Sequence, residues 1–134
     1  MKKASLLAIP VVLFVVALYL GVSALDREAE RFSAQRLAAL QAQDALVLVD
    51  IHATWCVTCR RQREILRRYR EAHPEVALRI LSVDFDHDKQ AVRDLGASYQ
   101  STLVLYRGKE RVWFSVGETR AEVIFAQLNA AAGL

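Results

Sequence analysis

The sequence has 134 residues, which suffice for one domain, and 54% of them are hydrophobic. Its formal net charge of +3 depends on Lys2 and Lys3, because the chain without them holds 16 of the 18 basic groups against 15 acidic groups. This near neutrality argues against a nucleic-acid partner, which normally requires a basic surface.

The N-terminus has a basic start followed by an apolar run. No charged residue occurs in 4–24, a length that can cross a hydrocarbon core of about 30 Å as a helix. We predict that 1–24 contains a transmembrane anchor. The alternative is a signal peptide cleaved near Ala24, since Val22-Ser23-Ala24 offers a small-residue site. Lys2 and Lys3 predict a cytoplasmic N-terminus, so both interpretations export the remaining chain.

Residues 25–44 are predicted to connect this segment to the domain through an amphipathic helix over 26–43, because apolar side chains recur there among charged and Gln residues. The uninterrupted apolar run over 45–49 predicts a central strand, over 45–51, that is covered on both faces. A long helix then follows Cys56 and ends at His73-Pro74. Six arginines on it are interpreted as a solvated face, with anionic lipid or an acidic partner as the alternative: Arg60, Arg61, Arg63, Arg67, Arg68 and Arg70.

The rest of the domain, which is expected to extend over 45–134, is predicted from hydrophobic patterns and turn residues. The predicted elements are a strand over 76–83, a short helix over 89–95, a hairpin of strands over 102–106 and 111–116, and a last helix capped by Thr119.

Cys56 and Cys59 are the only two cysteines and stand between the central strand and the long helix. A disulfide that closes so short a loop stabilises a fold by only about 2 kcal/mol in the chain-entropy model, so it would be a weak staple. A thiol at the start of a helix meets free backbone N–H groups, which favour the thiolate. We therefore predict a reversible dithiol, with metal ligation and an inert structural pair as the alternatives.

The motif around these cysteines resembles the thioredoxin family. The matching residues are Val47-Leu48-Val49-Asp50 followed by Ala53-Thr54-Trp55-Cys56-Val57-Thr58-Cys59-Arg60. The resemblance implies an α/β, thioredoxin-like fold with a four-stranded mixed sheet flanked by helices. It also implies a protein-disulfide reductase that needs no cofactor beyond its cysteines, in which Cys56 attacks and Cys59 resolves the mixed disulfide. The Val-Thr dipeptide is more similar to membrane-linked domains that carry electrons to the bacterial periplasm.

The chain departs from the family in the loop that faces the cysteines. Where the family has a cis-proline before a threonine, this chain has Gln100-Ser101-Thr102. A cis bond before a non-proline residue costs about 2.5–4 kcal/mol, so the loop is expected to be trans or strained. The resemblance implies that Gln100, Ser101 and Thr102 contact substrate, with Trp55 as a lid and a platform for partners.

Asp50 is an acid inside an apolar run, which predicts burial and a raised pKa. We interpret it as the group that takes a proton from Cys59, the alternative being an acid that merely turns toward solvent. The family's lysine opposite this acid is missing, because Ile80 occupies its place. His52 either tunes the thiols or is a bystander.

These observations predict a thiol-disulfide oxidoreductase anchored in the bacterial inner membrane and facing the periplasm, or soluble there after cleavage. Its partners would be protein disulfides and a transmembrane dithiol donor that regenerates it. The alternative is a non-catalytic thiol chaperone or metal-binding module of the same fold.

Overall fold

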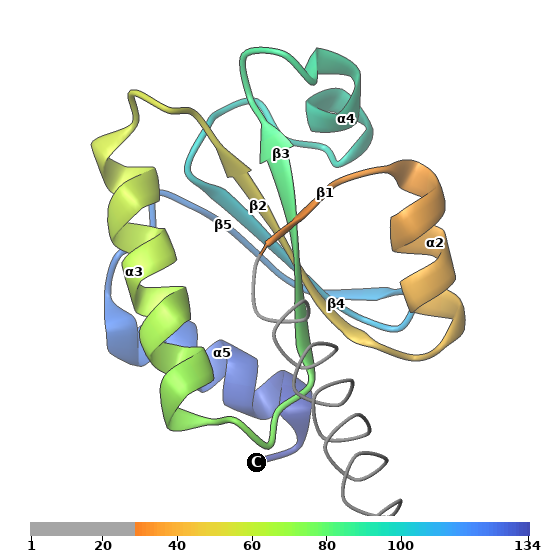
Figure 1. The fold of residues 1–134 in the computed structure, drawn as a ribbon, viewed down its shortest axis with the longest axis vertical. Coiled ribbons are helices and arrows are strands. Elements are labelled where there is room, and N and C mark those ends of the chain that lie inside the picture. Colours follow the sequence, from red (N-terminus) through yellow and green to blue (C-terminus); the bar gives the residue numbers. More distant parts are fainter. Residues whose placement is uncertain (1–28) are drawn as a thin grey trace, which may run out of the picture.

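The computed structural model describes residues 29–134, which form a central sheet covered by helices on both faces (Figure 1). The predicted anchor or signal segment lies outside these residues. Within 29–134, no helix combines the length and the apolar character needed to cross a membrane. The elements are β1 Glu30–Arg31, α2 Ala34–Ala42, β2 Leu46–His52, α3 Val57–Ala72, β3 Leu78–Asp84, α4 Lys89–Asp94, β4 Thr102–Arg107, β5 Glu110–Val116 and α5 Ala121–Ala132.

The sheet has the strand order β1-β3-β2-β4-β5. Strand β2 lies at its centre, parallel to β3 on one side and antiparallel to β4 on the other. Strands β4 and β5 form the predicted hairpin. The sheet is therefore mixed, as the resemblance implied.

Alternate residues of β2 supply two separate cores, which explains its continuous apolar run. Leu46 and Leu48 pack in one cluster with residues of α3 and α5, including Tyr69 and Leu128. On the other face of the sheet, the alternate residues Val47, Val49 and Ile51 of β2 pack with residues of α2 and α4. Figure 1 shows α3 and α5 together on one side of the sheet and α2 and α4 on the other.

The predicted four-stranded sheet is wrong by one edge strand. Glu30–Arg31 pairs in parallel with β3, and the Phe32 N–H donates to the Ser82 carbonyl at 2.9 Å. Two residues are too short to show a strand pattern in sequence. The predicted helix over 26–43 accordingly begins only after Ser33, whose hydroxyl caps α2 by accepting from the Arg36 N–H.

The last helix, α5, begins where it was predicted, but Thr119 does not cap it. Its first residue follows Arg120, and the Thr119 side chain makes no capping bond. Instead, the Glu118 carboxylate accepts the backbone N–H groups of Thr119 and Arg120. Glu118 thus satisfies donors that the predicted threonine cap leaves open.

Candidate active site

The cysteine pair sits at the start of α3, directly beyond the C-terminal end of β2. Cys56 is the N-cap residue, and its Sγ accepts the Cys59 N–H at 3.0 Å. The two cysteines form a disulfide with a Cα–Cα distance of 5.3 Å. The helix therefore directs a free N–H group and the positive end of its dipole at the Cys56 sulfur, as the sequence predicted.

The two cysteine residues differ in burial. Cys56 is 4% exposed, whereas Cys59 is fully buried. Both pack with Ala53 and Phe85 in a small cluster. Cys56 is accordingly the cysteine closer to the surface, and its role as the attacking thiol stays a prediction.

Ser101 faces this pair from the loop between α4 and β4. Its Oγ lies 3.4 Å from Cys56 Sγ and 3.7 Å from Cys59 Sγ. No peptide bond within 29–134 is cis, and Ser101 adopts a left-handed backbone with φ of 59°. The loop is thus trans at this position and stands in a region that L-residues other than glycine rarely adopt.

Gln62, which was not among the residues predicted for the site, holds the Ser101 loop. Its Nε2 donates to the carbonyls of Ser101 and Glu118, both at 3.0 Å, although the residue is fully buried on α3. The signal was available: Gln62 stands three and four residues before Ile65 and Leu66 on the buried face of the helix. A polar side chain there requires specific partners.

The other predicted substrate contacts occupy different environments. Thr102 is fully buried, and its hydroxyl donates to the Tyr99 carbonyl at 2.7 Å, so this side chain fixes the loop. Gln100 is half-buried. The contact of these residues with substrate stays a prediction.

Exposed apolar side chains adjoin the reactive sulfur. Trp55 is 60% exposed, Val57 is 68% exposed, and Tyr99 near Ser101 is 64% exposed. The Trp55 indole N–H donates to the Asp86 carboxylate at 2.8 Å, which fixes the ring at the surface. Such a surface suits contact with another protein better than contact with a small polar molecule.

Asp50 is fully buried on β2, and neither carboxylate oxygen has a hydrogen-bond partner within the described residues. Burial raises its pKa from 3.8 to about 6, and the positive charge of Arg63 opposes this rise. The prediction of burial and a raised pKa is therefore confirmed. The positive charge that acts on Asp50 therefore comes from α3 rather than from the position of Ile80. Arg63 is itself exposed, as the interpretation of a solvated helix face predicted.

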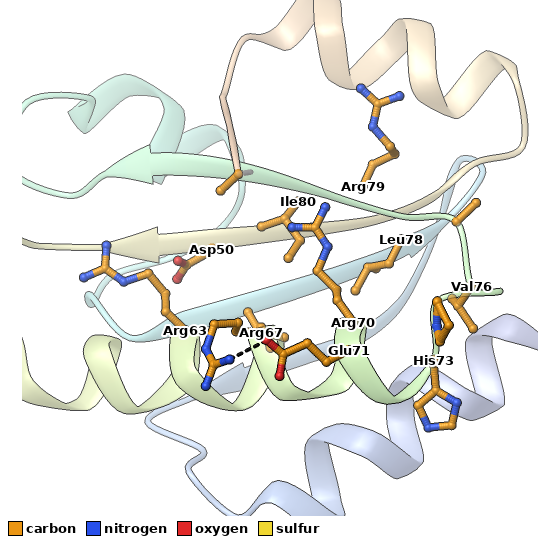
Figure 2. Close-up of a pocket in the computed structure, with 14 residues that line it drawn as sticks. Asp50, Arg63, Arg67, Arg70, Glu71, His73, Val76, Leu78, Arg79 and Ile80 are labelled. Atoms are coloured by element: carbon orange, nitrogen blue, oxygen red, sulfur yellow. Dashed lines mark hydrogen bonds and ion pairs between the residues drawn. The ribbon is translucent and has the colours of Figure 1, made fainter. Parts of the chain in front are cut away.

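Asp50 lies at a groove of about 860 Å³ between α3 and the sheet, which Ile80 also lines. Figure 2 shows Arg63 extending from α3 beside Asp50, with Arg67 and Arg70 farther along the same helix. Arg67 forms ion pairs with Glu64 and Glu71. Asp50 thus borders a groove with several arginines in its lining, although both of its carboxylate oxygens are buried.

The His52 side chain contacts the neighbouring strand β3. Its Nε2 lies 2.7 Å from the Ser82 hydroxyl on β3. Burial lowers the pKa of His52, with Arg63 adding to this effect and Asp84 opposing it. Burial therefore favours the neutral imidazole, and its contact with Ser82 on the neighbouring strand fits a bystander better than a group that tunes the thiols.

The cysteines are the redox group of the site. Among residues 29–134, no group of three or more His, Cys, Asp or Glu side chains is arranged to hold a metal ion. Two exchangeable sulfurs at a helix N-terminus, with a buried acid on the adjacent strand, define a thiol-disulfide oxidoreductase of the thioredoxin type.

Comparison with known proteins agrees with this class. The thioredoxin family profile matches residues 28–130. The chain is 31% identical over 85 residues to a thioredoxin of Alicyclobacillus acidocaldarius, covering 63% of this chain and 80% of that protein. It is also 31% identical to thioredoxin-2 of Saccharomyces cerevisiae, covering 64% and 81% of the two chains.

A solved structure, Trxlp from Edwardsiella tarda, superposes with a TM-score of 0.70 and 37% identity, covering 75% of this chain and 98% of that one. The chain therefore belongs to the thioredoxin family.

Proposed function

We propose that this protein reduces disulfides of other proteins outside the cytoplasmic membrane, with Cys56 as the attacking thiol. The observation that carries the proposal is the placement of Cys56. It is the more exposed of the two cysteine residues, it caps α3, and it lies between Trp55 and Val57, whose side chains are exposed. An apolar rim around a reactive sulfur favours a protein substrate.

The reaction proceeds by two exchanges. The Cys56 thiolate attacks one sulfur of the substrate disulfide, a mixed disulfide forms, and the other substrate sulfur leaves as a thiolate that takes a proton from water. Cys59 then loses its proton and attacks Cys56 Sγ, which releases the second substrate thiolate. The substrate gains two electrons, and the enzyme ends as the Cys56–Cys59 disulfide.

Asp50 is the proton acceptor for Cys59 in this proposal, directly or through water. A pKa of about 6 lets the carboxylate exist near neutral pH and still bind a proton readily. In this proposal the proton leaves through the groove that Asp50 borders.

The extracytoplasmic location and the electron donor rest on the sequence. The uncharged run over 4–24 follows Lys2 and Lys3, the pattern of a segment that exports what comes after it. An oxidising compartment returns no electrons to the pair, so a transmembrane dithiol carrier is the implied donor. Mass spectrometry of the mature N-terminus separates the alternatives, since a start at Leu25 would show cleavage.

Trapping tests the function. A Cys59→Ser variant is expected to accumulate covalent complexes with substrate proteins through Cys56, and a Cys56→Ser variant is the matched control that traps none. The full chain should reduce insulin disulfides with turnover. Its reduction potential should lie below about −180 mV, because a value well above this would indicate an enzyme that forms disulfides.

One observation favours a second function. Ser101 replaces the family's proline beside both sulfurs. The alternative is a thiol chaperone or a metal-binding module. Stoichiometric copper binding by a protein that shows no turnover in the insulin assay would support this alternative.

A further inference from the structure

Ser101 brings a hydroxyl to the sulfur that reacts. Its Oγ is within 3.4 Å of Cys56 Sγ, and the residue is buried. Sulfurs joined in a disulfide carry no proton, so the hydroxyl is the only possible donor in this contact. The proline that the family places here has neither a hydroxyl nor an N–H group to donate.

We propose that Ser101 is a catalytic residue whose hydroxyl donates a hydrogen bond to the Cys56 thiolate of the reduced enzyme. The thiolate then has two donors, because the Cys59 N–H already lies 3.0 Å from the same sulfur. Hydrogen bonds to an ionised group favour ionisation and are about twice as strong as bonds between neutral groups. The inference rests on the function proposed above, in which Cys56 is the attacking thiol.

The backbone around Ser101 is held in the conformation that this contact needs. With φ of 59°, the residue is in an unfavourable region for a serine, so other contacts must stabilise it. The Ser101 carbonyl accepts both the Gly117 N–H at 2.8 Å and the Gln62 side-chain amide at 3.0 Å. Because the same amide also donates to the Glu118 carbonyl, Gln62 ties the loop before β4 to the loop after β5. Gln62 is therefore a positioning residue for the hydroxyl.

Charged groups also stand on the elements around the pair. Lys89 lies over the ring of Phe85, which packs against the cysteines. The others stand on the elements that carry or adjoin the pair: Asp50 on β2, Arg60 and Arg63 on α3, Asp86 beyond β3 and Glu118 beyond β5. Substitutions at Ser101 leave all of them in place, so a shift in Cys56 ionisation measures the hydroxyl.

The test is a thiolate titration of the full chain in mild detergent, in a Cys59→Ser background where Cys56 is the one remaining thiol. Ser101→Ala and Ser101→Gly both remove the hydroxyl, and only the glycine also relieves the positive φ. We expect both to move the ultraviolet thiolate transition upward by about one pH unit. Alkylation by iodoacetamide at a pH below the transition should slow about tenfold.

An unchanged transition in both variants would overturn the proposal. A shift in the alanine variant alone would also overturn it, because the effect would then come from the backbone. Gln62→Leu tests positioning: it should produce part of the shift, and adding Ser101→Ala should yield less than the sum of the two shifts. A Gln62→Leu transition equal to that of the parent would contradict the positioning role.

The titration does not depend on any protein substrate. If the proposed reductase function failed, wild-type chain would not turn over insulin, while the ionisation shift would persist. A failure of the Ser101 proposal would leave insulin reduction intact and abolish the shift.

Discussion

Arg63 on α3 and Asp50 on β2 line the same groove, and the guanidinium charge lowers the pKa of a carboxyl group that burial has raised. The family to which this chain belongs was expected to supply such a charge from the strand position that Ile80 now holds. Ile80 does line the groove, and the cation comes from the helix on its other side. The chain thus keeps a positive charge near its buried acid while changing the element that carries it.

Arg63→Gln should therefore raise the pKa of Asp50 further. Well below the pKa, each additional unit reduces the ionised fraction tenfold, so Cys59-dependent release of the mixed disulfide should slow by up to about tenfold near pH 5.5. The rate should recover at higher pH. Stopped-flow measurement of this release between pH 5 and 8 gives the profile.

Two further variants make this result specific. Adding Ile80→Lys to Arg63→Gln should move the profile back, because it restores a cation at the groove. Arg67→Gln removes a charge one turn along the helix, from a residue paired with Glu64 and Glu71, and should leave the profile in place. Equal effects of the two arginine variants would show that only the overall charge of α3 matters.

Asp50 also makes stability depend on pH. Its folded pKa of about 6 is above the ordinary 3.8, so the folded state binds the proton more tightly than the unfolded state. The stability contributed by protonation is full below pH 3.8 and is lost as pH rises through 6. Two units correspond to about 3 kcal/mol as an order of magnitude.

We therefore expect Asp50→Asn to stabilise the oxidised protein by about 2–3 kcal/mol at pH 8 and to have little effect at pH 4, where the carboxyl is already neutral. Urea unfolding at both pH values measures the difference. Asp94→Asn, at an exposed acid on α4, is the control and should add no comparable stability. A gain from Asp50→Asn that is equal at both pH values would contradict the burial of the charged form.

The sequence predicted those parts of the fold that have strong local patterns. The apolar run before Asp50 predicted a strand covered on both faces, and the turn residues between 106 and 111 predicted the hairpin. Strand β1 was not predictable in this way, because a two-residue edge strand depends on its pairing with β3 rather than on its own residues.

The site residues that lie close together in the sequence were predictable. Cys56, Cys59 and Trp55 follow one another in a recognisable motif. Gln62 and Arg63 were not recognised, because their roles depend on tertiary contacts with Ser101 and Asp50, which lie on other elements. Helical spacing marks Gln62 as buried, yet it gives no information about which carbonyls the amide meets.

Tyr69 links the two helices on one face of the sheet. Its hydroxyl donates to the Asn129 side chain at 2.9 Å, and its ring meets Phe125 edge-on at 5.1 Å between centroids. Tyr69→Phe should cost about 1 kcal/mol, because it removes the hydrogen bond and keeps the ring. Urea unfolding should show this loss with the reduction potential unchanged, and a shifted potential would indicate that α5 influences the cysteines.

We expect the exposed Trp55 ring to contribute to the reduction of protein substrates and not to that of small disulfides. Trp55→Ala removes apolar area next to Cys56 but leaves the helix N-terminus and its N–H group intact. If the ring contributes to docking, kcat/KM for insulin should fall roughly tenfold, the effect of losing about 1.4 kcal/mol of contact. Reduction of a small aromatic disulfide should change much less.

Phe114→Ala is the matched control for Trp55→Ala, since Phe114 is also an exposed aromatic residue but lies on the edge strand β5. This variant should reduce both substrates at the wild-type rate, because β5 carries neither a cysteine nor the Ser101 loop. Equal losses for insulin and the small disulfide in Trp55→Ala would mean that the ring acts on the sulfurs themselves. The hydrogen bond from the Trp55 indole to Asp86 would then keep the ring in a position that shields the disulfide. Protein substrates would in that case contact the exposed side chains of Val57 and Tyr99 instead.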